Sequence, residues 1–279
     1  MSGAATRLFA LLGDPVTHSL SPALQNAAIK HAGVDATYVA LRCSATDFSG
    51  LMFGLAHAGG GGNVTLPHKG SAAEMVDVAS KRVRATGACN TFWLERGRVR
   101  GENTDVPAFT QALRRVIEDL HGAHVLIVGA GGAARAAVYA LLEEGCDAIT
   151  VLGRSRARGP QLRRVAGRHT KKLTYTTSAS RVRGQGFDLV VNATPLGLRT
   201  TDRLPLRFEQ LAGLTAVFDM VYKKGGTAWT SYAQALGIPA VDGKEMLVFQ
   251  AAAAFAIWFD TEPPISTMRG VLARMSVRA

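Results

Sequence analysis

Lys69 has the chemistry of a proton donor. It ends the segment NVTLPHK at residues 63–69, just beyond a strand-like run that glycines precede. Beside a ketone, an ammonium group stabilises the alkoxide that develops during hydride transfer and can supply the proton. A lysine after a strand is usually a surface charge, so Lys69 alone does not establish a catalytic site. Asn90 and Asp105 also lie near strand ends, where Asn and Asp are common in turns.

Ser19 and Ser21 place two hydroxyl groups at the expected start of a helix, in HSLSP at 18–22. Since the first N–H groups of a helix are free and its dipole is positive there, the two serines could hold a substrate carboxylate. The alternative is that Ser21 only caps the helix. We expect Ser21 to cap it, Pro22 to take its first position and Gly33 to end it.

A glycine-rich turn follows the apolar run at 124–128, with Gly129, Gly131 and Ala134 at GxGxxA spacing. Gly129 permits a tight turn, Gly131 lets the backbone approach a pyrophosphate, and Ala134 lets the following helix pack closely. A structural glycine turn is the alternative. The strand before it and the helix after it favour dinucleotide binding.

The next strand, at 148–152, indicates which dinucleotide is bound. NAD-binding chains place a carboxylate there to accept a hydrogen bond from the ribose 2′-hydroxyl. Here the strand is followed by Gly153, Arg154, Ser155, Arg156, Ala157 and Arg158. Guanidinium groups match a 2′-phosphate, so we predict NADP, with Arg154 and Arg158 as contacts. A solvated arginine-rich loop is the alternative, above all for Arg156.

Another polar turn, NATPLG at 192–197, follows the strand-like residues Val190 and Val191. A turn at the carboxyl end of a Rossmann strand lies near the nucleotide crevice. Taken alone, it could equally be a simple capped turn.

The N-terminal third alternates between strand-like and helical runs, which predicts parallel strands with crossover helices. These runs are 8–12, 24–31, 37–41, 48–58 and 63–66. Residues 89–94 and 98–102 flank a short connection with Gly97, which predicts a hairpin. A helical run from Pro107 to Leu120 then marks a change of domain.

A second alternation begins at His124 and predicts a doubly wound, Rossmann-like domain. Its strands are expected near 125–128, 149–152, 189–191, 217–220 and 239–241. The segment from Lys244 is helical and should fold back onto the first domain. The predicted fold is therefore α/β with two domains: a substrate domain of 1–105 plus 243–279, and an NADP-binding domain of 106–242.

Composition bounds the class of protein. The chain has 279 residues, of which 47% are hydrophobic and 19% charged, which is typical of a globular protein. Cys43, Cys89 and Cys146 are odd in number and widely spaced, which suits neither a disulfide framework nor a zinc site. The apolar run 246–259 is too short to span a bilayer, and the N-terminus lacks the features of a signal peptide, so we predict a cytoplasmic protein.

The net charge of +11 would suit an anionic partner. A basic surface that only aids solubility explains most of these charges equally well. RNA-recognition aromatics and zinc-finger spacings are not found, which argues against nucleic acid. We predict a small-molecule substrate, no nucleic-acid or membrane partner, and a monomer or homodimer.

Eight short motifs resemble those of the shikimate dehydrogenase family, in the same order along nearly the full chain. They are HSLSP at 18–22, NVTLPHK at 63–69, GACNT at 87–91, GENTD at 101–105, GAGGAAR at 129–135, NATPLG at 192–197, DMVY at 219–222 and MLVFQAA at 246–252. So many motifs in one order are highly specific. The resemblance implies reversible, NADPH-dependent reduction of 3-dehydroshikimate to shikimate, a step of aromatic amino acid biosynthesis.

By position, the resemblance makes Lys69 and Asp105 the catalytic pair. A carboxylate beside an ammonium keeps it charged and fixes its direction, which agrees with that role. The implied substrate contacts are Ser19, Ser21, Thr65, Asn90, Asp105, Tyr222 and Gln250. The expected cofactor contacts are Gly129, Ala130, Gly131, Gly132, Ala133, Arg154, Ser155, Arg158, Asn192, Thr194 and Gly243.

Three positions depart from the usual family pattern. His68 stands where an aromatic or apolar residue is frequent, Gly153 where Asn is frequent, and Glu245 where Gly is frequent. Glu245 puts the substrate preference in doubt, so quinate and aminoshikimate stay open as substrates. From other classes, a non-catalytic NADP-binding regulator and a module that binds nucleic acid through its charge are the alternatives.

Overall fold

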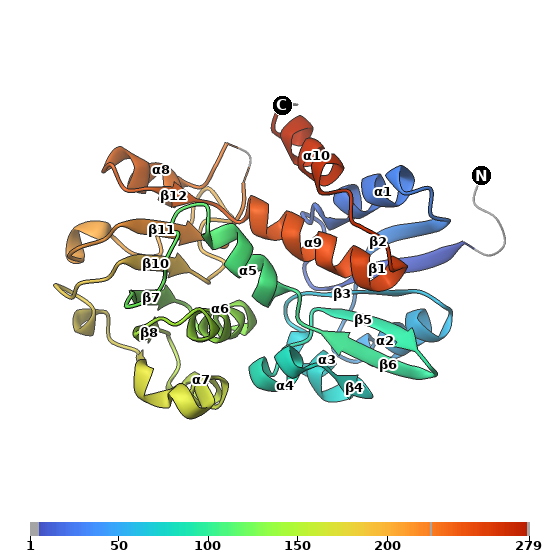
Figure 1. Ribbon diagram of the computed structural model, residues 1–279, viewed down its shortest axis with the longest axis horizontal. Helices are drawn as coiled ribbons and strands as arrows, with labels where there is room; N and C mark the ends of the chain where they lie inside the picture. The colour runs from blue at the N-terminus through green and yellow to red at the C-terminus, as the bar shows by residue number, and fades with distance from the viewer. Residues whose placement is uncertain (1–5, 224, 278–279) are drawn as a thin grey trace. The chain divides into compact units, whose positions relative to one another are not determined.

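The computed structural model describes residues 6–223 and 225–277. The chain forms two compact units, one of Met1–Ala108 with Leu247–Ala279 and one of Phe109–Met246. The unit boundaries thus fall a few residues beyond the predicted 105 and 242. Each unit is an α/β structure with its own sheet (Figure 1), as the sequence predicted.

The first unit has a mixed sheet, which within the described residues contains six strands in the order β2-β1-β3-β5-β6-β4. The strands are β1 Arg7–Gly13, β2 Ala36–Arg42, β3 Gly61–Val64, β4 Val78–Ala79, β5 Thr91–Glu95 and β6 Arg98–Glu102. Strands β1, β2 and β3 are parallel, as predicted. Strands β5 and β6 form the predicted hairpin, with Arg96 and Gly97 both at positive φ in its two-residue turn.

The topology of this sheet brings three chain segments to one place. Strand β3 is antiparallel to β5, and β5 is antiparallel to β6. Thr91, at the start of β5, therefore pairs with Asn63 near the end of β3 and with Glu102 at the end of β6. The residues that follow β3, precede β5 and follow β6 must lie together.

The helices of the first unit include the C-terminal segment, as predicted. They are α1 Ser21–His31, α2 Phe48–His57, α3 Lys69–Met75, α4 Lys81–Thr86, the greater part of α9 Lys244–Phe259, and α10 Ile265–Val277. Helix α9 packs on the sheet through Trp258, whose ring centroid lies 4.9 Å from that of Phe9. Helix α10 packs against α1 (Figure 1). No helix within the described residues has both the length and the apolar character needed to cross a bilayer.

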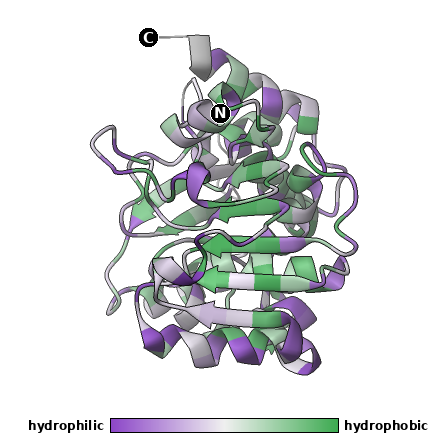
Figure 2. Cartoon of the chain, turned by 90° about the vertical axis from the view of Figure 1, so that its left-hand side faces the viewer, coloured by the Kyte–Doolittle hydropathy of each residue, from purple (hydrophilic) through white to green (hydrophobic). Residues whose placement is uncertain are grey.

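The second unit is a parallel, doubly wound sheet. Among the described residues its strand order is β12-β11-β10-β7-β8-β9, the Rossmann order. The strands are β7 His124–Val128, β8 Ala148–Leu152, β9 Leu173–Thr176, β10 Leu189–Asn192, β11 Ala216–Asp219 and β12 Ala240–Val241. Figure 2 shows strands of this sheet largely in the colour of hydrophobic residues, as expected where helices cover both faces.

The second unit's helices connect these strands. They are α5 Asp105–Leu113, whose first residues belong to the other unit, α6 Gly132–Glu143, α7 Gly159–Ala166 and α8 Ala228–Ala235, with 3₁₀ turns η1 Arg156–Arg158, η2 Gly167–Lys172, η3 Ala179–Arg181 and η4 Phe208–Gln210. Helices α6 and α7 pack together, whereas α8 packs on β11 and β12.

One helix end was predicted wrongly, and several short elements, α3, β4, α4 and β9, were not expected. The helix that begins at Asp105 ends at Leu113 and not at Leu120, because the chain turns at 114–116 before it enters β7. Strand β9 was not expected at all. It has only four residues, Leu-Thr-Tyr-Thr, and follows a basic 3₁₀ turn that gives no strand signal.

The glycine run at 59–62 has a packing reason. Strand β3 lies between β1 and β5, and a Cβ atom on Gly62 would lie 2.1 Å from the carbonyl oxygen of Ala10. On Gly61, a Cβ atom would lie 2.5 Å from the carbonyl oxygen of Phe92. Backbone atoms in a sheet cannot move aside, so only glycine fits, and the segment that leads into Lys69 is fixed by this close approach.

We expect Gly62→Ala to lower the free energy of unfolding by about 1–3 kcal/mol, because the added methyl group overpacks the sheet. Gly50→Ala is the matched control, since Gly50 lies within helix α2 with open space around it; it should gain about 0.5–1 kcal/mol. Urea unfolding followed by circular dichroism measures both. Equal stability of Gly62→Ala and the natural chain would contradict this packing.

Candidate active site

Lys69 and Asp105 form a close ion pair. The Lys69 Nζ atom lies 2.5 Å from Asp105 Oδ2, and the side chains are only 21% and 9% exposed. Lys69 opens helix α3, and its carbonyl oxygen accepts a 2.9 Å hydrogen bond from the Cys89 N–H. Asp105 lies in the first turn of α5, where the helix dipole favours a carboxylate. Both partners thus start a helix just after a strand-end turn.

Asn90 holds the acid of this pair. Its Nδ2 atom donates to Asp105 Oδ1 at 2.9 Å and to Thr104 Oγ1 at 3.0 Å. Its Oδ1 atom accepts from the Thr104 N–H at 2.8 Å. Asn90 and Thr104 are 2% and 1% exposed, so this orientation is fixed by buried hydrogen bonds. One carboxylate oxygen of Asp105 is therefore occupied by Asn90, and the other faces Lys69.

A second buried amide extends the network into the sheet. Asn63 donates to the Asn90 carbonyl oxygen at 3.1 Å and to Thr91 Oγ1 at 2.9 Å, and it accepts from the Tyr38 hydroxyl at 2.8 Å. Sequence reasoning assigned no role to Asn63, Thr104 or Tyr38. The only available signal was that Asn63 and Thr104 belong to the polar motifs around Lys69 and Asp105.

Thr65 begins the turn that leads from β3 to Lys69. Its N–H donates to the Leu12 carbonyl oxygen at 2.9 Å, and its carbonyl oxygen accepts from the His68 N–H at 2.9 Å. A Cβ atom on Gly13 would lie 2.3 Å from Thr65 Cγ2. The end of β1 therefore needs glycine so that the segment with Thr65 and Lys69 can lie against it.

Helix α1 starts differently from the prediction. Ser21 is its first residue, Pro22 is its second, and Leu20 takes the cap position without a side-chain hydrogen bond. The serine that contacts the helix start is Ser19, whose Oγ accepts from the Ser21 N–H at 3.2 Å. Ser21 as cap was therefore wrong, because a serine already inside the helix cannot accept from the next turn's N–H groups. Gly33 has φ +65° just after the helix, as an ending glycine should.

Gln250 lies in α9 and is partly exposed. Its Nε2 atom donates to the Leu247 carbonyl oxygen at 3.1 Å in its own helix. Thus the bond that satisfies this amide is local, and it leaves Gln250 Oε1 as an acceptor for another group.

The departures at His68 and Glu245 have local explanations. The His68 ring is 3% exposed and stacks on Phe48 with ring centroids 4.7 Å apart, so it fills the place of an aromatic residue. Its Nε2 lies 3.0 Å from the Cys43 carbonyl oxygen. Glu245 forms an ion pair with Arg115 at 3.2 Å.

The glycine turn of the second unit has the form that a dinucleotide site needs. Gly129 has φ +113°, and a Cβ atom on it would lie 2.8 Å from the Ala193 backbone. Gly131 caps α6 with open space around it, and Ala134 is fully buried. Residue 130 completes this turn, and residues 132 and 133 begin α6. The turn lies where the strand order reverses between β7 and β10, the usual ligand crevice of such sheets.

Asn192 and Asp219 join the neighbouring strand ends. Asn192 Nδ2 donates to Asp219 Oδ1 at 2.8 Å, and Asn192 Oδ1 accepts from the Thr194 N–H at 3.0 Å. Asp219 also accepts from the Val221 N–H at 3.0 Å and the Thr227 hydroxyl at 2.7 Å. Asp219 is fully buried, and burial raises its pKa to about 6, although these donors oppose the rise. Sequence reasoning missed its role, although DMVY contains it.

Gly243 and Tyr222 lie in the same unit. The Gly243 N–H donates to the Val221 carbonyl oxygen at 3.1 Å, and a Cβ atom there would lie 2.3 Å from the Met220 carbonyl oxygen. The predicted substrate residue Tyr222 thus belongs to the second unit, whereas the other predicted substrate residues belong to the first.

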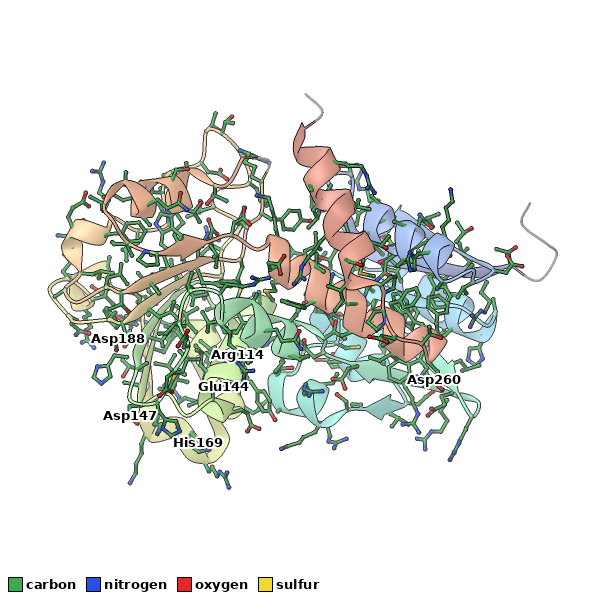
Figure 3. All side chains as sticks on the ribbon, turned by 45° about the horizontal axis from the view of Figure 1, so that its top comes forward. Arg114, Glu144, Asp147, His169, Asp188 and Asp260 are labelled. Atoms are coloured by element: carbon green, nitrogen blue, oxygen red, sulfur yellow. The ribbon has the colours of Figure 1, made fainter. Side chains whose placement is uncertain are left out.

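The charged residues of the second unit differ between the amino ends and the carboxyl ends of its strands. Near the amino ends of the strands, Asp147 pairs with Lys172 at 3.3 Å, Asp188 accepts from the His124 N–H at 2.8 Å, and Arg114 pairs with Glu144 at 3.3 Å (Figure 3). At the carboxyl end of β8, Arg154 and Arg158 are exposed, and neither has an ion pair within the described residues. Positive charge without a carboxylate suits a phosphate. In the described part, no three His, Cys, Asp or Glu side chains gather as a metal site.

Comparison with known proteins decides the family. Three family descriptions match: "Shikimate dehydrogenase substrate binding domain" at residues 11–92, "Shikimate / quinate 5-dehydrogenase" at 111–196 and "Shikimate 5'-dehydrogenase C-terminal domain" at 243–273. The shikimate dehydrogenase (NADP(+)) of Maricaulis maris is 37% identical over 253 residues, 90% of each chain. The chain belongs to the shikimate dehydrogenase family.

Solved structures agree with the shikimate dehydrogenase fold. One is shikimate 5-dehydrogenase from Thermus thermophilus in complex with NADP(H) and shikimate, with a TM-score of 0.84 and 33% identity over 97% of this chain and all of that one. The 5-ketofructose reductase of a Gluconobacter strain also has a TM-score of 0.84, at 27% identity over 98% of this chain and 100% of that one. The fold alone therefore does not fix the substrate.

The raised pKa of Asp219 gives a test of this buried cluster. Because the folded state holds the proton more tightly than the unfolded state, this group makes the free energy of unfolding fall as pH rises from about 4 to about 6. We expect that loss, on the order of 3 kcal/mol between pH 4 and 7, to disappear in Asp219→Asn. Urea unfolding at several pH values measures it. If the free energy of unfolding changed with pH in the same way in both proteins, the raised pKa of Asp219 would be contradicted.

Proposed function

We propose that this protein reduces 3-dehydroshikimate to shikimate with NADPH, and catalyses the reverse reaction with NADP⁺. The observation that carries the proposal is the nearly buried Lys69–Asp105 pair, fixed by Asn90. A fixed ammonium group of this kind is what carbonyl reduction requires, because negative charge develops on the ketone oxygen. The hydride that the carbonyl carbon accepts would come from NADPH when this cofactor is bound.

Lys69 supplies the proton. Its ammonium hydrogen-bonds to the ketone oxygen, stabilises the developing alkoxide and then transfers one proton to it, which forms the alcohol. Asp105 holds and directs the Nζ atom of Lys69 before that transfer, through the 2.5 Å bond between them. In the oxidation direction Lys69 accepts the proton of the hydroxyl group.

The remaining polar groups of the first unit suit a hydroxylated ring acid. Ser19 and Ser21 at the start of α1 are proposed to bind the carboxylate, while Thr65 and Gln250 bind ring hydroxyls. Both amide hydrogens of Asn90 already bind Asp105 and Thr104. We therefore propose that Asn90 acts chiefly by positioning Asp105, and that a ring hydroxyl binds Asp105 itself.

NADP fits the second unit by its donors and its charge. The turn at Gly129–Ala133 offers N–H groups of the α6 start to the pyrophosphate. Arg154, Ser155 and Arg158 are proposed to bind the 2′-phosphate, and the Asn192 and Thr194 turn and Gly243 to border the nicotinamide half. Cys43, Cys89 and Cys146 are free and buried, which suits a reducing compartment, so we propose a cytoplasmic enzyme.

Other polyhydroxylated ketones are the second candidate substrates, because a 5-ketofructose reductase shares this fold. A steady-state assay at about 340 nm, where reduced nicotinamide absorbs, separates the cases: shikimate, quinate and fructose are each offered with NADP⁺ and with NAD⁺. We expect the highest kcat/KM for shikimate with NADP⁺. Faster turnover of quinate or fructose would contradict the proposed substrate, and a preference for NAD⁺ would contradict the proposed cofactor. Absence of turnover with tight NADP⁺ binding would favour a regulator.

We expect Lys69→Ala to lower kcat by roughly 100- to 10,000-fold, since a positioned proton donor contributes that much, and to change KM far less. Lys30→Ala is the matched control, because Lys30 is an exposed lysine at the end of α1 in the same unit. It should keep the natural kcat. An unchanged kcat in Lys69→Ala would refute the assigned role.

A further inference from the structure

Tyr175 contacts the arginine loop, which we define as residues 153–159 after β8. It lies in β9, the edge strand beside β8, and its hydroxyl donates to the Ser155 carbonyl oxygen at 2.5 Å. The Arg158 N–H donates to the same oxygen at 3.1 Å. The bond that closes the Ser155–Arg158 turn and the bond from Tyr175 therefore meet at one atom.

The Tyr175 ring also fits against glycine at both ends of the loop. A Cβ atom on Gly153 would lie 2.3 Å from the Tyr175 hydroxyl oxygen and 2.9 Å from its Cε2. On Gly159, a Cβ atom would lie 3.0 Å from Tyr175 Cδ1. This contact explains the departure at Gly153: the tyrosine occupies the space that a side chain there would need.

Gln161 gathers two guanidinium groups next to this loop. Its Oε1 atom accepts from Arg158 Nη1 at 3.4 Å and from Arg135 Nη1 at 3.2 Å. Arg135 lies in α6, the helix of the glycine turn, and Gln161 lies in α7. One neutral amide thus holds two like charges side by side. Burial, and after it the charge of Arg158, lowers the pKa of Arg135.

The charge of this loop suits an anion. Arg158 has no ion pair within the described residues. A phosphate dianion accepts strong, charge-assisted hydrogen bonds from a guanidinium group. The loop at this end of β8 therefore offers Arg158 to a phosphate.

We propose that Tyr175 is a specificity-determining positioning residue for the 2′-phosphate of NADP. It fixes the Ser155 carbonyl oxygen, and through it the backbone of Arg158, so that the guanidinium group of Arg158 points to the phosphate. This inference rests on the proposed NADP-dependent function. It adds a residue that lies outside every motif that predicted the site, in a strand that the sequence did not indicate.

A positioning role of this kind gives a selective effect. Tyr175→Phe keeps the ring between Gly153 and Gly159 but removes the bond to Ser155. The loss of one hydrogen bond loosens only the turn that carries Arg158, so ligands with a 2′-phosphate lose affinity and ligands without it do not. A structural role alone would weaken both equally.

The test is direct binding to the purified full chain, by isothermal titration calorimetry with NADP⁺, NAD⁺ and adenosine 2′,5′-bisphosphate. We expect Tyr175→Phe to bind NADP⁺ and the bisphosphate about 5-fold more weakly, the scale of one hydrogen bond, and NAD⁺ within about 2-fold of the natural protein. Tyr232→Phe is the matched control, because Tyr232 lies in α8, which packs on β11 and β12 at the other edge of the sheet. It should change none of the three affinities.

A second variant keeps the proposal testable if Tyr175→Phe folds poorly. Gly153→Ala should weaken NADP⁺ selectively by displacing the tyrosine, and its effect should shrink in the Tyr175→Phe background, where its shortest contact is gone. Equal losses for NADP⁺ and NAD⁺, or no loss, would overturn the role of Tyr175. If the natural protein itself fails to prefer NADP⁺, the proposed function fails instead.

Discussion

The packing of the first unit depends on one ion pair. Its lysine and aspartate lie 2.5 Å apart and largely away from water. Removing charges from water is costly unless each is paired and hydrogen-bonded. The sheet meets this condition by topology: antiparallel β3, β5 and β6 bring the ends of three segments together. Asn90, at the centre, gives both its amide hydrogens to the segment that carries Asp105. The glycines of β3 allow the close packing that this convergence needs.

In the second unit, too, the sheet brings several strand ends together. The groups collected there are backbone N–H groups and arginines, and not a buried ion pair. Its parallel strands end at one edge, where the glycine turn, the Asn192 turn and the arginine loop follow β7, β10 and β8. Asp219 ties two of these strand ends together from a fully buried position. A buried side chain that would not touch the cofactor, Asp219, thus fixes loops that would bind it.

The sequence predicted what depends on local pattern. The glycine fingerprint, the hairpin at Gly97 and the return of the C-terminal helices could be derived from spacing and composition, and the family motifs singled out Lys69 and Asp105. It did not predict β9, since four residues after a basic turn carry too little periodicity. The supporting contacts of Asn90 and Tyr175 were also out of reach. Those contacts join segments far apart in the chain, and only three-dimensional packing shows which groups meet.

The central claim is that Lys69 and Asp105 act as one unit. A double-mutant cycle in kcat for reduction of 3-dehydroshikimate tests it directly, with Lys69→Met, Asp105→Asn and the double variant. If Asp105 acts by directing Lys69, it has nothing to act on once Lys69 is gone, so the double variant should be no slower than Lys69→Met alone. Losses that multiply fully in the double variant would show that the two residues act independently and would contradict this account.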